Sequence, residues 1–117
     1  MSNNLYLVFS ERPGRISDEQ YHAWYADHAQ ENIESPGFLS AQRYRVREVV
    51  SGEATGPEQH LTVYDYEGPM TTWRTDLSAR IQRGDVVLPE WFKDIKFTSW
   101  TCEPTGDLLR PHREAAQ

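Results

Sequence analysis

The stretch Tyr21-His22-Ala23-Trp24-Tyr25-Ala26-Asp27-His28 decides the fold of this 117-residue chain. Five residues follow the spacing i, i+3, i+4, i+7 and i+11, which is typical of one helix face: Tyr21, Trp24, Tyr25, His28 and Asn32. A face that serves only for packing would carry leucine, isoleucine and valine, whereas this one carries hydroxyl, imidazole and amide groups. The stretch therefore predicts an inward-facing helix that also forms the wall of a pocket.

Signals on both sides of this stretch set the length of the helix. Ser17, followed by Asp18, Glu19 and Gln20, predicts a capping box for the first backbone N–H groups, and the two acidic residues suit the positive end of the helix dipole. Pro36 biases Ser35 away from helical backbone angles, and Gly37 permits a sharp turn. The helix is therefore expected to end near Glu34.

The rest of the chain predicts a sheet for this helix to cover. Short apolar or alternating runs predict strands at 5–9, 38–50, 60–66 and 96–102, and a loop is expected over 51–58. A second helix is expected over 69–83 and one short helical turn over 89–93. Arg43, Arg45 and Arg47 alternate along the second strand and predict a solvated row. The order β-α-β-β-α-β predicts an α+β, ferredoxin-like fold, with a four-stranded antiparallel sheet covered by two helices on one face.

Composition limits the partners and the compartment. The net charge of −6 is spread along the sequence, which argues against nucleic acid or an anionic membrane as the main partner. Cys102 is the only cysteine, and no leader or membrane-spanning run is visible, so a cytoplasmic protein is expected. One domain over 1–104 is followed by a tail over 105–117 that drapes over the body or a neighbouring subunit. Apolar residues occupy both faces of the first and third strands, so a homodimer is predicted.

The pattern Tyr21-x-x-Trp24-Tyr25-x-x-x-His28, followed by Pro36-Gly37-Phe38, resembles the EthD-like branch of the dimeric α/β-barrel superfamily. The resemblance is close over the first helix and its exit turn, and elsewhere it rests on the order of elements. It implies two ferredoxin-like protomers that pair their sheets into a barrel, each with a pocket between sheet and helices. Relatives include polyketide cyclases, cofactor-free monooxygenases, lyases and isomerases of aromatic compound metabolism, and haem-degrading enzymes. Many relatives have a proline two residues after the histidine, where this chain has Gln30.

With this resemblance, His28 is the first candidate for a general acid or base, because an imidazole beside tyrosine hydroxyls can transfer protons near neutral pH. The alternative is a core histidine that is satisfied by a backbone carbonyl or a tyrosine hydroxyl. Tyr21 and Tyr25 are candidates for hydrogen bonding to a substrate carbonyl or enolate, with core packing as their alternative. Trp24 is expected in the core, at a dimer contact or under a substrate ring. Asn32 either fixes the imidazole tautomer or caps the helix.

The third strand supplies a second set of candidates. Asp65 shares a strand face with apolar neighbours and is a second candidate proton carrier, unless it meets water at the end of the strand. His60, Tyr64 and Tyr66 point to the other face, and they line the pocket if that face meets the helices. The histidines lack i, i+4 spacing and the chain lacks nucleotide-binding glycine motifs, so no metal and no cofactor are expected. Haem on His28 stays open by analogy with haem-handling relatives.

These residues predict a cofactor-free enzyme in which His28, assisted by a tyrosine, transfers protons on an aromatic, polyketide or other carbonyl-bearing hydrophobic substrate. Lyase, cyclase and isomerase reactions all fit this description. A cofactor-free monooxygenase of phenolic substrates is one alternative, because tryptophan and tyrosine near a dry pocket can hold an electron-rich phenol for reaction with oxygen. A protein that binds haem or another hydrophobic ligand without transforming it is the other.

Overall fold

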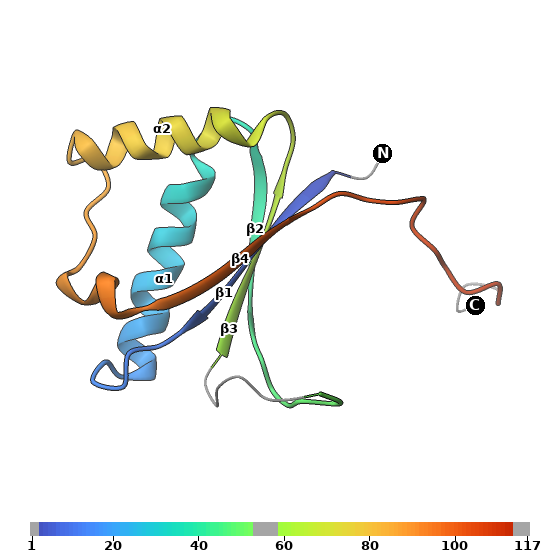
Figure 1. Cartoon of the computed structure of the whole chain (residues 1–117), viewed down its shortest axis with the longest axis horizontal. Helices are drawn as coiled ribbons and strands as arrows, with labels where there is room; N and C mark the ends of the chain where they lie inside the picture. The colour runs from blue at the N-terminus through green and yellow to red at the C-terminus, as the bar shows by residue number, and fades with distance from the viewer. Residues whose placement is uncertain (1–2, 53–58, 114–117) are drawn as a thin grey trace.

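The computed structural model describes residues 3–52 and 59–113. Its elements are β1 Asn4–Glu11, α1 Asp18–Ile33, β2 Phe38–Arg45, β3 Gln59–Tyr66, α2 Met70–Gln82, the 3-10 helix η1 Glu90–Asp94 and β4 Lys96–Cys102. The four antiparallel strands form one sheet in the order β2-β3-β1-β4, and both helices lie on one side of it (Figure 1). The predicted ferredoxin-like fold is confirmed.

Local signals place α1 as expected. The Oγ atom of Ser17 accepts a hydrogen bond from the backbone N–H of Gln20 at 3.1 Å, which caps the first turn. After the helix, Gly37 adopts a φ of +103°, and a Cβ atom there would lie 3.0 Å from the carbonyl oxygen of Glu67. The carbonyl oxygen of Gly37 in turn accepts the backbone N–H of Glu67 at 2.8 Å. This exit turn therefore needs glycine, and it ties the end of α1 to the end of β3.

The core lies between the sheet and α1, and it is built mainly from aromatic rings. Its fully buried members are Val8, Ile16, Tyr21, Tyr25, Ala29, Tyr64 and Ile95. The ring centroids of Tyr21 and Tyr25 lie 5.6 Å apart at an interplanar angle of 69°, the edge-to-face arrangement that aromatic pairs favour. The stripe on α1 thus meets the sheet, as the sequence predicts.

We call the other side of the sheet the open face. Alternation along the paired strands places Leu5, Leu7, Phe9, Leu61, Val63 and Trp100 on it. Neither helix covers this side, as Figure 1 shows. Trp100 is 58% exposed and Tyr44, opposite Leu61, is 51% exposed. The open face therefore presents several apolar side chains without a covering element from the described chain.

Two details of β2 differ from the sequence-based expectation. The strand ends at Arg45 rather than near residue 50, and Arg45 is the last residue of β2 paired with β3. Arg43 is not part of a solvated row, because it lies on the helix side of the sheet and is half-buried against α1. Its guanidinium carbon lies 4.3 Å from the ring centroid of Tyr25, a cation–π contact. Only Arg45 and Arg47 remain exposed.

The chain beyond β4 runs away from the body of the molecule, as Figure 1 shows. We call residues 103–113 the arm. They contain no helix or strand, and each of them is exposed. Among the described residues, no helix has the length and apolar content needed to cross a bilayer.

Candidate functional site

A cavity of about 280 Å³ lies between the sheet, the two helices and η1. Its lining combines eight aromatic or imidazole rings with three small or aliphatic side chains and one amide: Tyr6, Val8, Tyr25, His28, Asn32, Phe38, Tyr64, Trp73, Leu77, Phe92, Phe97 and Ser99. A larger hollow of about 620 Å³, around residues 11–15, has a charged lining without aromatic rings. An apolar cavity with a few convergent polar groups is the usual form of a small-molecule site, so we take the aromatic cavity as the candidate site.

His28 is held in this wall by aromatic rings. It is buried, and it stacks on Trp24 with centroids 4.7 Å apart and an interplanar angle of 14°. The edge of its ring faces Phe92, whose centroid is 5.9 Å away. Burial lowers the pKa of His28 from 6.5 to about 4, because a charged imidazolium is poorly solvated there. His28 is therefore neutral near pH 7.

The two ring nitrogens of His28 have different surroundings. Nδ1 is fully buried without a hydrogen-bond partner, and it lies 3.9 Å from Oε1 of Glu31, one helical turn further on. Nε2 is not enclosed in this way, although no hydrogen bond to it is found among the described residues. Nε2 is therefore the nitrogen available to a ligand, and Glu31 is placed to stabilise positive charge on the ring.

Two tyrosines of the wall remain neutral. Burial raises the pKa of Tyr64 to about 12, and the hydrogen bond from Asn32 only partly offsets this effect. Burial likewise raises the pKa of Tyr25. Because Asn32 Nδ2 donates to the hydroxyl oxygen of Tyr64 at 3.0 Å, the hydroxyl proton of Tyr64 is left to point elsewhere. Asn32 thus orients a tyrosine rather than the imidazole.

Three buried polar atoms of the wall lack hydrogen-bond partners: Nδ1 of His28, Oδ1 of Asn32 and Nε1 of Trp73. Buried polar atoms are satisfied in the great majority of native structures, and each unsatisfied one costs roughly 1–3 kcal/mol. All three residues line the same cavity. Asn32 Oδ1 is therefore an unused acceptor, and Trp73 Nε1 is an unused donor, in two residues of the wall.

The other predicted residues of α1 support the site from behind. Tyr21 donates its hydroxyl proton to Ser10 at 2.6 Å and is completely buried away from the cavity. Trp24 packs against His28 on one side and Trp91 on the other, with centroids 4.9 Å apart for the tryptophan pair. Both residues are structural supports for the wall.

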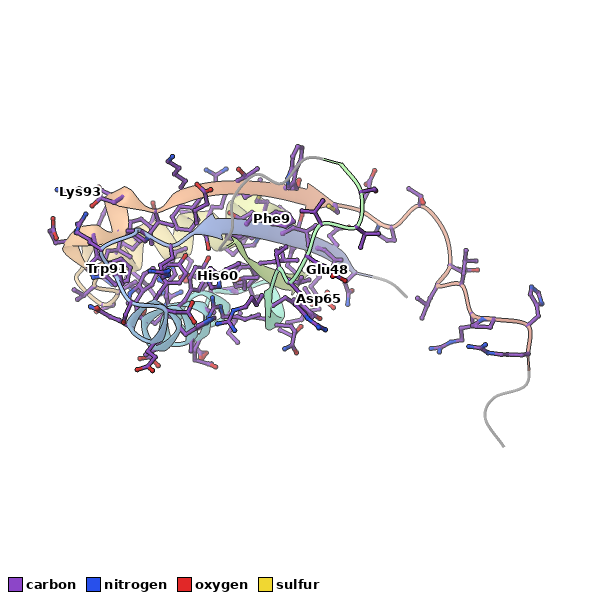
Figure 2. All side chains as sticks on the ribbon, turned by 90° about the horizontal axis from the view of Figure 1, so that it is seen from below. Phe9, Glu48, His60, Asp65, Trp91 and Lys93 are labelled. Carbon is purple, nitrogen blue, oxygen red and sulfur yellow. The ribbon has the colours of Figure 1, made fainter. Side chains whose placement is uncertain are left out.

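The predicted residues of β3 separate into two groups. His60, Tyr64 and Tyr66 lie on the helix side, but only Tyr64 lines the cavity, while Tyr66 packs on Trp73 at a centroid distance of 6.1 Å. Asp65 lies on the open face, across the sheet from His28, so the structure does not bring these two residues together. Figure 2 shows His60 and Asp65 toward opposite ends of the strand.

His60 belongs to a separate polar cluster with Asp18 and His22, whose potential ligand atoms lie within 4.8 Å of one another. Burial lowers the pKa of His60 to about 4 and also lowers that of His22. Guanidinium groups already contact His22: Arg43 at 3.1 Å from Nδ1, and Arg45 at 2.5 Å from Nε2 and 2.6 Å from Asp18. These positive charges oppose a bound metal ion, so the cluster functions as an ion-pair network at the start of α1.

Several wall residues were not among the predicted ones: Tyr6, Val8, Phe38, Trp73, Leu77, Phe92, Phe97 and Ser99. They come from five different elements, and nothing in the sequence shows which face of each element meets α1. Glu31 was also missed, although its i, i+3 spacing from His28 is visible in the sequence. Trp73 was missed too, although its place as the first aromatic residue of α2 is visible in the sequence.

Comparison with known proteins adds to this geometry. No family model matches the chain, and no curated protein does. A crystal structure of a MhuD mutant, with two manganese protoporphyrin IX molecules bound per active site, is 20% identical, with a TM-score of 0.58 over 92% of this chain and 99% of that one. A candidate monooxygenase from Shewanella loihica PV-4 is 13% identical, with a TM-score of 0.50 over 95% and 99%. These likenesses support the ferredoxin-like fold.

The comparisons also correct the leading functional prediction. Neither structure is described as a lyase, a cyclase or an isomerase; one holds a porphyrin and the other is described as a monooxygenase. The expectation of lyase, cyclase or isomerase chemistry is therefore wrong, and the two alternatives raised from the sequence agree better with these neighbours. By fold, the chain is similar to ferredoxin-like proteins of oxidative and porphyrin-binding function.

Proposed function

We propose that this protein is a cofactor-free monooxygenase that oxidises a small phenol in the aromatic cavity. One observation carries the proposal: three residues that line one apolar cavity, His28, Asn32 and Trp73, each have a buried polar atom without a hydrogen-bond partner. The hydroxyl of a phenol can donate its proton to the imidazole or to the amide oxygen, and its oxygen can accept a hydrogen bond from the indole N–H. The surrounding rings accept its aromatic body.

The proposed reaction balances without an external reductant. His28 Nε2 accepts the proton of the phenol hydroxyl, and the electron-rich ring then reacts with O₂ at the carbon opposite that hydroxyl. One oxygen atom of O₂ stays on this carbon as a carbonyl, and the other leaves as water with the hydrogen of the ring carbon and the hydroxyl proton that His28 returns. The phenol supplies the four electrons and becomes a quinone.

Proton transfer to His28 is uphill, and the site reduces its cost. A phenol has a pKa near 10, against about 4 for His28, so transfer costs roughly 8 kcal/mol. Attraction between phenolate and imidazolium about 4 Å apart returns roughly 4 kcal/mol at an effective dielectric constant of 20. The remaining cost of proton transfer, roughly 4 kcal/mol, is smaller than an activation barrier of about 16 kcal/mol, which corresponds to roughly ten turnovers per second. Phenols acidified by a conjugated carbonyl are therefore expected to transfer this proton at a lower cost.

The size of the cavity favours a phenol over haem. At roughly 20–30 Å³ for each non-hydrogen atom, about 280 Å³ holds one or two fused rings. The four pyrrole rings and side chains of a protoporphyrin exceed this several-fold. The residues present do not fit a porphyrin, and no step of the proposed reaction passes through one.

The proposal includes a homodimer of the EthD-like type. The open face leaves Leu7, Phe9, Val63 and Trp100 without cover from the described chain, and a second copy of the same face would bury them. Two-fold pairing of one surface with itself is the commonest arrangement of soluble oligomers. The pattern from Tyr21 to His28 supports placement in the EthD-like branch.

Oxygen uptake tests the function directly. The wild-type protein is incubated with a panel of one- and two-ring phenols in an oxygen electrode, and quinone formation is followed by absorbance. We expect one O₂ consumed for each quinone formed, and a loss of at least about a hundredfold in His28→Gln. His112→Gln, a change in the exposed arm, is the matched control and keeps full activity.

The outcomes separate the two remaining functions. Saturable binding of a phenol without oxygen uptake, unchanged by His28→Gln, would indicate a ligand-binding protein and reject the monooxygenase. Uptake that persists in a folded His28→Gln protein would reject the role of the histidine. A Soret band that develops at one haem per chain would contradict the argument from cavity size.

A further inference from the structure

The arm begins beside an acidic hollow on the open-face side of the sheet. This hollow has a volume of about 460 Å³, and its lining includes the carboxylates of Asp65, Glu103 and Asp107. No arginine, lysine or histidine is among its described lining residues. Oδ1 of Asp65 is fully buried and has no hydrogen-bond partner. The hollow thus holds three acidic groups whose charge is not balanced within it.

The far end of the arm carries the opposite charge. Arg110 and Arg113 follow Leu108 and Leu109, which are 71% and 90% exposed. Neither arginine forms an ion pair with a described residue. Figure 1 shows the arm running away from the body, so its end lies away from the acidic hollow at its own base. Leu108 still lines the hollow of its own chain, whereas Leu109, Arg110 and Arg113 are not among the lining residues of the hollow.

We propose that the basic end of each arm docks in the acidic hollow of a second copy of this chain, with Arg110 paired to Asp65 of the other protomer. The inference rests on the homodimer proposed above. The arm continues from β4, an edge strand that contributes Trp100 to the open face, so a partner on that face is within its course. Two-fold symmetry makes the exchange reciprocal, and each dimer then has two such contacts. Leu109, which is 90% exposed, is covered at the same time.

A charge swap in the full-length protein tests the pairing. Dimer dissociation constants are measured by analytical ultracentrifugation for wild type, Asp65→Lys, Arg110→Asp and the double variant. Each single change is expected to weaken the dimer about tenfold, and the double variant is expected to recover to within about threefold of wild type. Arg47→Asp, at an exposed arginine outside the arm, is the matched control and leaves the constant unchanged.

A second variant does not depend on Asp65, which is partly buried in the sheet. Leu109→Ser changes a side chain that is 90% exposed and does not line the hollow, and it is expected to weaken the dimer by about tenfold as well. A wild-type protein that stays monomeric overturns the proposed dimer. A wild-type dimer whose constant is unaffected by the single changes, or whose double variant shows the sum of two losses, overturns the docking of the arm alone.

Discussion

The neutral state of His28 makes stability depend on pH in a way that can be measured. Its pKa is 6.5 in the unfolded chain and about 4 in the folded one. Protons therefore bind the unfolded state first as the pH falls, and the folded state loses stability from about pH 6.5 down to about pH 4. The loss is about 2 kcal/mol at pH 5 and on the order of 3 kcal/mol when both states are protonated. Above pH 6.5 the effect is absent.

The assay compares urea unfolding of wild type and His28→Gln near pH 7 and near pH 5. The variant should lose about 2 kcal/mol less than wild type between these two pH values, because the carboxylates contribute equally to both proteins. His60→Gln should behave in the same way, since burial also lowers the pKa of His60 to about 4. His112→Gln is the control. An imidazole pKa of 6 or more for His28 by NMR, or equal losses in wild type and His28→Gln, would refute the argument from burial.

Three further predictions concern the fold and the open face. Gly37→Ala should lower the free energy of unfolding by more than about 1 kcal/mol, because φ is +103° and the new Cβ meets a carbonyl oxygen. Gly14→Ala places its Cβ in open space and should change the free energy of unfolding little. Urea unfolding of both proteins checks this prediction. Tyr21→Phe removes a hydrogen bond of 2.6 Å and leaves a buried serine hydroxyl unpaired, so a loss of about 1–2 kcal/mol is expected in thermal unfolding. Trp100→Asp should convert the proposed dimer to a folded monomer in analytical ultracentrifugation. Val87→Asp, which also changes an exposed apolar residue, should leave the dimer intact. A dimer that survives Trp100→Asp contradicts the open face as the dimer interface.

Local chemistry explains why the order of elements could be predicted. Ser17 caps α1, Gly37 allows its exit turn, and the alternation in β3 separates Tyr64 from Asp65. Each of these signals involves only a few neighbouring residues, so it can be recognised from the sequence. Predicted strand ends were less accurate, since residues 46–50 have suitable side chains but no opposite residue in the sheet.

The sequence predicted only part of the candidate site, and the reason is different. The spacing along α1 predicted His28, Tyr25 and Asn32 as pocket residues, and all three line the cavity. The same stripe also named Tyr21, which is buried behind the wall, because helical spacing fixes a face but not which part of that face meets a cavity. Trp73 lies 41 positions further along the chain than Asn32, and no local rule relates the two.

By itself, the sequence determined the helix with its polar aromatic stripe and the β-α-β-β-α-β order, because helical spacing, capping and strand alternation are local properties. Only the tertiary structure decided which side of β3 faces the helices. It moved Asp65 away from His28, placed Arg43 beneath α1, and gathered three unpaired polar groups around one cavity. The physical reason is that a cavity, a pKa shift and an unsatisfied hydrogen bond depend on which distant surfaces come together when the chain packs.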